Sequence, residues 1–330
     1  MTAGSVGGAA RAQGATVRRS IAWDGDAARK QASIAFARSA LAARPSVFCI
    51  PTLRLGTAGQ ADDPSNVYCA AFGTADPSEL ESRSGLPAST LMLASAALSV
   101  CVRWDQAGED MPRVPGLVAG AIEAPLNALE AIPVGADTLA LARRYVVDLL
   151  GRLADPRNHG GRGLTAEHQA LLRQLATLHD EGCTDPVAFR ALRRAATGAT
   201  DAATGDLARP ALGFVESVAW PIEGLTEELP ELVSRLHLDL RLKLLLEQQS
   251  PQECATLDAL SDMYRAVSDR ERVDLTFDAQ AERERIETTP EYAAANEPAL
   301  LARLDRNDLV ATEAYAPFAV DLLIGAFRRA

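Results

Sequence analysis

The sequence is poor in lysine and in aromatic residues, and its positive charge is almost entirely arginine. Lys30 and Lys243 are the only lysines, and aromatic residues make up 5% of the chain. Acidic residues outnumber basic ones by 44 to 33, which gives a formal net charge of −11. Proteins that bind nucleic acid present a basic surface to the phosphates. We therefore expect no nucleic-acid partner.

The chain also lacks CxxC spacing and a recognisable export signal. Its cysteine count is odd and the cysteines are widely scattered, a pattern typical of reduced thiols in a reducing compartment. The first 20 residues contain no apolar run of the kind that a secretory signal needs. We therefore predict a cytoplasmic protein. The cysteines are Cys49, Cys69, Cys101, Cys183 and Cys254.

One uncharged stretch, Ser84 to Val102, is long enough to raise the question of a membrane span. It contains Gly85 and Pro87, and its compact apolar part runs only from Leu91 to Val102. A membrane-spanning helix needs about 20 apolar residues. We therefore interpret the stretch as a buried core helix and predict no membrane span.

Three segments are expected along the chain. Residues 1–22 have no periodicity and few large apolar groups, so we predict a flexible tail that is dispensable for folding. The sequence DPRNHGGRG at 155–163 is the strongest break in the chain. It predicts an N-terminal helical lobe at 23–155 and a C-terminal helical lobe at 164–330.

The remaining pattern predicts a mainly α fold, a bundle or array of roughly a dozen helices. Leucine, valine and alanine recur at three- and four-residue steps from Asp137 to Ala154, which is the pattern of an amphipathic helix. Thr165 predicts the cap of a helix ending near Glu181, and Ser250 with Glu253 forms a capping box.

Five more segments are expected from local signals. Asp76, followed by a proline and a glutamate, should open a helix. The highly charged stretch from Asp269 to Glu287 predicts an exposed helix with ion pairs. Pro290 and Pro298 should each start a short segment, and Ala316 to Phe327 should dock as a final apolar helix.

Two regions carry strand-like patterns. The apolar runs Val47–Leu55 and Val67–Phe72 predict a small β-hairpin near residues 47–72. Leu236 to Leu244 (LHLDLRLKL) alternates strictly, yet leucine is a strong helix former and is not β-branched. We interpret this second segment as a central helix surrounded on most sides, with Leu240 and Leu244 deeply buried.

Three histidines and one cysteine fall close together in the sequence: His159, His168, His179 and Cys183. His168 and His179 are eleven residues apart, so on one helix they share a face but lie about 16 Å apart along the axis. A shared zinc ion needs about four convergent ligands. We interpret the group as partly exposed histidines at helix ends and a buried thiol. Two further hypotheses use the same residues: a divalent-metal site on the three histidines, or haem ligation by His179 with Cys183 as a tether.

Two short motifs resemble parts of metal-dependent enzyme families. Leu175 to Gly182 (LATLHDEG) looks like the His-Asp step of the HD-type metal phosphohydrolases, but the chain departs from that family's spacing of the other ligands. Asp258 and Asp262 form a DxxxD, as in the helical prenyl synthases, without a second acidic motif opposite. We interpret the DxxxD as a solvated helix face with Asp262 paired to Arg265.

Two functions from different classes follow. The first is a non-catalytic helical interaction protein, such as an adaptor, a regulator or a secretion-associated component, with a protein partner and room for a small-molecule ligand. It rests on missing catalytic motifs, acidic charge and the predicted tail. The alternative is a haem- or metal-dependent enzyme centred on His159, His168, His179 and Cys183.

Overall fold

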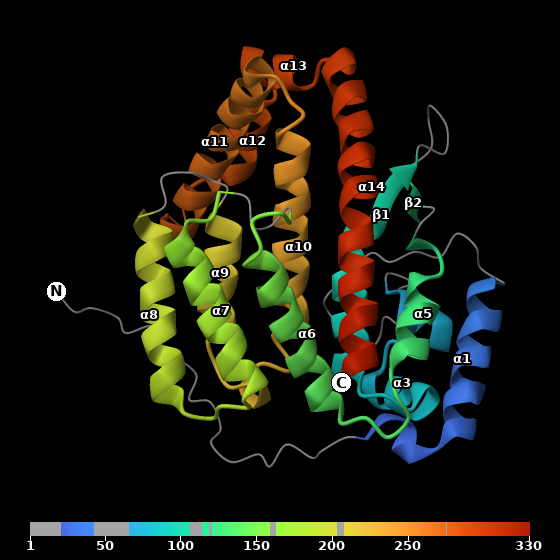
Figure 1. The fold of residues 1–330 in the computed structure, drawn as a ribbon. Coiled ribbons are helices and arrows are strands. Elements are labelled where there is room, and N and C mark those ends of the chain that lie inside the picture. Colours follow the sequence, from blue (N-terminus) through green and yellow to red (C-terminus); the bar gives the residue numbers. More distant parts are fainter. Residues whose placement is uncertain are drawn as a thin grey trace.

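The part of the chain that the structure describes is an array of helices with one short pair of strands (Figure 1). The computed structural model describes residues 21–42, 66–105, 114–118, 121–158, 163–202, 208–274 and 276–330. Within these ranges the chain forms fourteen α-helices and two strands. The prediction of a mainly α, multi-helix fold is confirmed.

The elements divide between the two halves of the chain. The first half holds α1 (Ala27–Ala42), α2 (Val67–Phe72), α3 (Pro77–Ser84), α4 (Ala88–Leu98), β1 (Val102–Asp105), β2 (Val114–Leu117), α5 (Ala124–Ala131) and α6 (Thr138–Leu153). The second half holds α7 (Ala166–Asp180), α8 (Pro186–Ala202), α9 (Arg209–Val218), α10 (Leu229–Leu246), α11 (Pro251–Val273), α12 (Ala279–Ile286), α13 (Pro290–Ala295) and α14 (Pro298–Arg329).

The predicted caps fix three helix starts. Asp76 accepts a hydrogen bond from the Glu79 amide at 2.9 Å, so its carboxylate satisfies a free donor of the first turn of α3. Thr165 caps α7, and Ser250 caps α11 in a reciprocal box with Glu253. These local signals place the starts of α3, α7 and α11 where the sequence predicts them.

The uncharged stretch at 84–102 is almost entirely buried. Helices α3 and α4 meet at a bend of 90°, and every residue of α4 except Ser89 is buried. A short 3-10 turn, Ser99–Cys101, then leads into β1. The interpretation of this stretch as a buried core helix is confirmed.

Helix α10 packs on α4, α9 and α14 and is the centre of the second half of the molecule. Leu240 and Leu244 are buried, as predicted, and the alternating segment is helical. In a helix, leucines at every second position are distributed around the axis, so some of their side chains lie on the outer face. The outer ones, Leu238, Leu242 and Leu246, are 38%, 49% and 38% exposed, so neighbours do not cover α10 on all sides.

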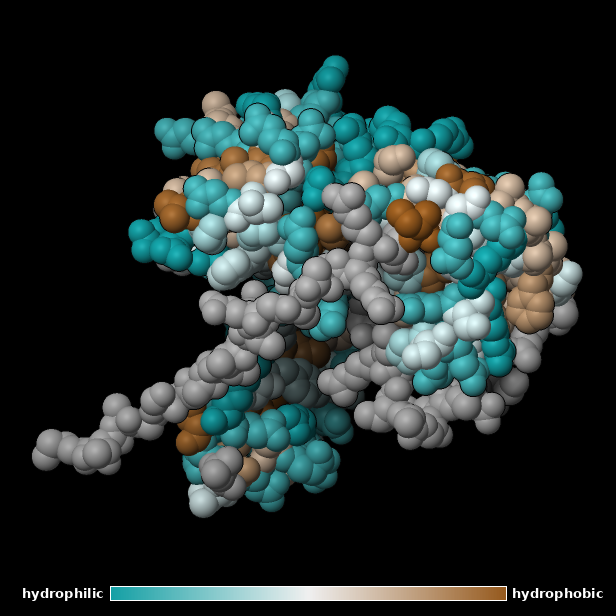
Figure 2. Space-filling model, turned by 90° about the horizontal axis from the view of Figure 1, so that it is seen from below, coloured by the Kyte–Doolittle hydropathy of each residue, from teal (hydrophilic) through white to brown (hydrophobic). Residues whose placement is uncertain are grey.

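One hydrophobic core runs through both predicted lobes, from Ala22 to Phe327. Helices α6 and α7, which flank the break at 155–163, pack directly against each other. A second, small cluster belongs to α11, α12 and α13 and is built around Val267, Ala279 and Ile286. The surface seen in Figure 2 is mostly hydrophilic, with hydrophobic residues in small separate patches.

The prediction of a β-hairpin near residues 47–72 is wrong for its second strand. Val67–Phe72 is helix α2, because the Asn66 side chain accepts hydrogen bonds from the amides of Tyr68 and Cys69 and starts a helical turn. The first predicted strand, at 47–55, lies outside the described residues. The strands of the described chain are β1 and β2, paired antiparallel with Val102 opposite Leu117.

Two expectations for the C-terminal region need correction. The charged stretch from Asp269 to Glu287 is not one helix, because Asp274 adopts an extended conformation and Asp278 caps the new helix α12 through the Ala281 amide. Pro298 starts no short segment. It sits in the first turn of α14, which runs for 32 residues and contains the apolar stretch predicted to dock at the end.

Most of the predicted tail, residues 1–20, lies outside the described residues. Its last two residues are bound to the body of the protein: Ala22 is fully buried, and its amide donates to the Ala136 carbonyl at 2.9 Å. Trp23 follows, fully buried, and its amide donates to the Gly85 carbonyl at 2.8 Å. The Lys30 ammonium lies 5.0 Å from the centre of the Trp23 ring.

By length and composition, α14 is the one described helix that meets the criteria for a membrane span on its own. In its most apolar window, 44% of the residues are buried inside the structure. The bent pair α3–α4 meets the same criteria when taken together. In the structure, α14 packs along α10, α6 and α5.

Because α10 has a buried and an exposed face, two leucine substitutions on this helix should lower the free energy of unfolding by different amounts. Leu244→Ala removes a buried side chain and should lower the free energy of unfolding by about 2–5 kcal/mol. The matched change Leu242→Ala, on the exposed face of the same helix, should lower it by less than about 0.5 kcal/mol. Urea unfolding measures both, and equal losses would contradict the orientation of α10.

Candidate functional site

The structure separates the residues of the His/Cys group by role. His159 lies outside the described residues. His168 sits in the first turn of α7, where its Nδ1 accepts from the Thr165 amide at 3.4 Å as part of the helix cap. His179 is at the other end of α7, and Cys183 follows beyond Gly182, which has a φ of 64° and ends the helix.

The His179 ring is buried in the core and is hydrogen-bonded there. It is 2% exposed, and its Nε2 lies 3.0 Å from the Val218 carbonyl oxygen. A carbonyl only accepts hydrogen bonds, so Nε2 carries the proton. The Phe189 ring packs on it with centroids 5.2 Å apart. Burial lowers the pKa of His179, which favours the neutral ring.

In the described part of the chain, no three His, Cys, Asp or Glu side chains lie together so as to hold a metal ion. The Nε2 atom of His179 is hydrogen-bonded to the Val218 carbonyl and is therefore not available to a metal ion. Cys183 is a partly buried free thiol. The geometry of the described members of this group, His168, His179 and Cys183, is therefore that of a helix cap and a core contact.

A buried polar network that the sequence did not single out lies deeper in the core. His237 of α10 is fully buried between two tyrosines. Its Nε2 lies 2.7 Å from the Tyr145 hydroxyl of α6, and its Nδ1 lies 2.9 Å from the Tyr315 hydroxyl of α14. A neutral imidazole has one donor and one acceptor, so one hydroxyl donates to the ring and the other accepts from it.

Burial determines the protonation of this network. Desolvation lowers the pKa of His237 to about 3 and raises the pKa of both Tyr145 and Tyr315 well above the usual value. All three groups are therefore neutral at physiological pH. Because the network joins α6, α10 and α14 and has no solvent exposure at its centre, it holds helices together and offers no room for a substrate.

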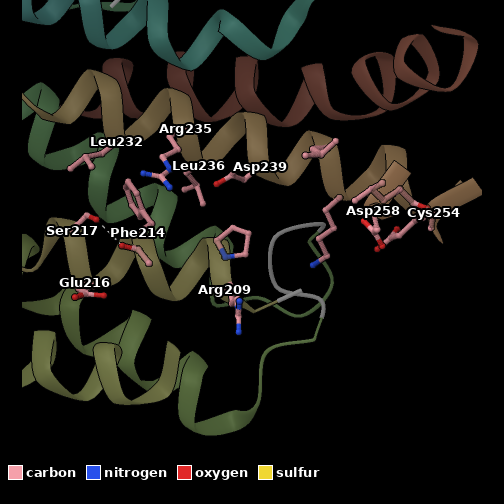
Figure 3. A pocket seen from close by; sticks show the side chains of 16 residues that line it. Arg209, Phe214, Glu216, Ser217, Leu232, Arg235, Leu236, Asp239, Cys254 and Asp258 are labelled. Carbon is pink, nitrogen blue, oxygen red and sulfur yellow. Dashed lines mark hydrogen bonds between the residues drawn. The ribbon is translucent and has the colours of Figure 1, made fainter. Parts of the chain in front are cut away.

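A groove large enough for a ligand lies between α9, α10 and the start of α11 (Figure 3). Its volume is about 870 Å³. Ligand-binding clefts typically range from about 300 to 1,000 Å³ and are largely apolar. The apolar lining of this groove consists mainly of Phe214, Leu232, Leu236, Leu242 and Leu246.

Charges of both signs surround the apolar lining. The cations are Arg209, Arg235 and Lys243, and the carboxylates are Glu216, Asp239, Glu247 and Asp258. Figure 3 shows Arg235 and Asp239 on α10 above Phe214 of α9, with Asp258 and Cys254 at the far end of the groove. Burial raises the pKa of Asp239, and the charge of Arg235 opposes that shift.

The two carboxylates of the DxxxD motif do not both line this groove. Asp258 lines it, whereas Asp262 is exposed and pairs with Arg265 at 2.8 Å. This ion pair confirms the predicted solvated face.

The sequence did not predict the groove. The available signal was the set of leucines in LHLDLRLKL that a helix with one buried face leaves on its outside.

Comparison with known proteins gave no match: no family model, no curated protein and no solved structure is similar to this chain.

The buried state of His237 predicts a dependence of stability on acid. In the unfolded chain, His237 has an ordinary pKa near 6.5 and is protonated below that pH. In the folded chain its pKa is about 3, so between about pH 6.5 and 3 only the unfolded chain binds this proton. The free energy of unfolding should therefore fall by about 1.4 kcal/mol per pH unit in this window. From pH 7 to 5, this residue alone should cost about 2 kcal/mol.

Urea unfolding of His237→Gln at both pH values measures this contribution, because His179 and the carboxylates titrate in both proteins. The variant should lose about 2 kcal/mol less than the parent on acidification. His168→Gln, at an exposed helix cap, is the matched control and should behave like the parent. If parent and His237→Gln have equal slopes, His237 does not remain neutral in the fold.

Proposed function

We propose that the protein is a non-catalytic interaction protein, an adaptor or regulator, that binds an amphipathic helix of a protein partner. The binding surface combines the α9–α10–α11 groove with a row of exposed side chains, the leucine ridge, formed by Leu238, Leu242 and Leu246. The single observation that supports it best is this row. Three of the four exposed leucines in the described chain lie on one helix.

The spacing of the leucine ridge suits a helical ligand. Its members are four residues apart, so they form an i±4 ridge on the surface of α10. Such a ridge packs into the groove between the corresponding rows of another helix, most often at a crossing angle near −50°. Isolated exposed leucines are ordinary on protein surfaces, whereas a row beside a groove marks an interaction site.

The groove adds an apolar pocket and charges beside the ridge. Leu242 and Leu246 belong to both, so a helix packed on the ridge would extend its side chains into the groove. The cations and carboxylates at the groove favour a ligand that also carries both signs, as a segment of a folded protein does. This is the helix-in-groove mode, with anchors at i, i+3, i+4 and i+7.

Selection from a displayed library of amphipathic helical peptides tests the proposal. The selected peptides should bind the parent protein, and Leu242→Glu or Leu246→Glu should weaken binding by about 10- to 100-fold, because each places a charge in an apolar contact. Val187→Glu, at a valine of α8 that is 62% exposed and outside the groove, is the matched control.

Fluorescence anisotropy with labelled peptides gives the dissociation constants. The control should bind within two-fold of the parent. The proposal is wrong if the library yields no binder, or if the selected peptides bind Leu242→Glu and Leu246→Glu as well as they bind the parent.

A further inference from the structure

The wall of the groove formed by α11 belongs to a unit with its own small core. Helices α11, α12 and α13 pack mainly on one another, and their apolar side chains gather around Val267, Ala279 and Ile286. Val267 is the one buried residue of the 23 in α11. We call α11–α13 the arm; Figure 1 shows it at the end of the molecule where α10 ends and α14 begins.

The interior of the arm is held by its own contacts. Arg283 of α12 pairs with Glu271 of α11 at 2.5 Å, and Arg270 stacks over the Phe277 ring at 4.4 Å. The first contact joins α11 to α12, and the second joins α11 to the connection that follows it; neither involves a residue of α9 or α10.

Among the described residues, the contacts between the arm and the rest of the chain include two short connections, an ion pair, and a hydrogen bond from the Cys254 thiol to the Leu246 carbonyl of α10 at 3.9 Å. The arm leaves α10 through residues 247–250 and returns to α14 through residues 296–297. The ion pair joins Arg303 of α14 to Glu253 of α11 at 2.7 Å. The same carboxylate accepts from the Ser250 amide at 2.8 Å, and these contacts hold the pKa of Glu253 at about 2.

We propose that the arm is a movable wall of the ligand groove, latched by the Arg303–Glu253 pair; this inference rests on the proposed function. Cys254 and Asp258 of α11 line the groove opposite α9 and α10. A helix bound in the groove contacts the body and the arm at once, and it favours the closed arrangement by its contacts with both. Breaking the latch lets the arm swing outward and opens the groove.

The Cys254 thiol reports this motion, because it lines the groove and donates to the Leu246 carbonyl of α10, a contact that is lost when the arm moves away. The full-length protein is treated with iodoacetamide, and the alkylation rate of each cysteine is followed by peptide mapping. Cys183, partly buried and outside the arm, is the internal reference. Glu253→Gln removes the charge of the latch, while glutamine still serves in the capping box with Ser250.

Glu253→Gln and Arg303→Met should each speed alkylation of Cys254 by about two- to five-fold, the range for one partly exposed ion pair. Cys183 should be unaffected. An unchanged Cys254 rate in both variants overturns the proposal, and so does an equal rise at Cys183, which would indicate general unfolding.

This assay uses no peptide, so its outcome is independent of whether a partner helix binds. In the closed complex, a selected helical peptide should slow Cys254 alkylation in the parent by more than two-fold. If the latch variants open but no peptide binds, the proposed function fails and the movable arm stands. If peptides bind and the latch variants do not differ from the parent, the movable arm is wrong and the proposed function stands.

Discussion

The burial of the inner face of α10 is the constraint on which the rest of the structure depends. Val233, Leu240 and Leu244 anchor this helix in the main core, where it packs on α4, α9 and α14. Because the segment LHLDLRLKL has leucine at every second position, burying one face necessarily leaves leucines on the other. The leucine ridge is therefore a direct consequence of the sequence that forms the core, and it borders the groove.

Polar contacts fix the rotation of α10 that apolar packing alone leaves adjustable. His237 bonds to Tyr145 and Tyr315, and one turn earlier the Ser234 hydroxyl lies 3.2 Å from that of Ser99. A buried polar group that loses its partner costs about 1–3 kcal/mol, so rotating the helix would break several favourable pairs at once. The network thereby keeps the leucine ridge outward and the groove lining in place.

Local chemistry predicted most of the helix starts, and the errors have two different causes, one a local cap that was overlooked and one a set of distant contacts. Ser250 with Glu253 identified the start of α11, and γ-branching identified α10 against its strand-like alternation. The short run at 67–72 was misread because its β-branched and aromatic content is overridden by the Asn66 cap. His237 was passed over because its partners lie 92 and 78 residues away, and sequence spacing carries no sign of them.

The most direct test of the account is the leucine methyl NMR spectrum of the protein with and without a selected helical peptide. The account predicts that the largest shift changes occur at Leu242 and Leu246, with a smaller change at Leu238, while the buried Leu240 and Leu244 hardly move. Saturation should follow a single binding curve. Changes centred on other helices, or equal changes at the inner and outer leucines of α10, would contradict it.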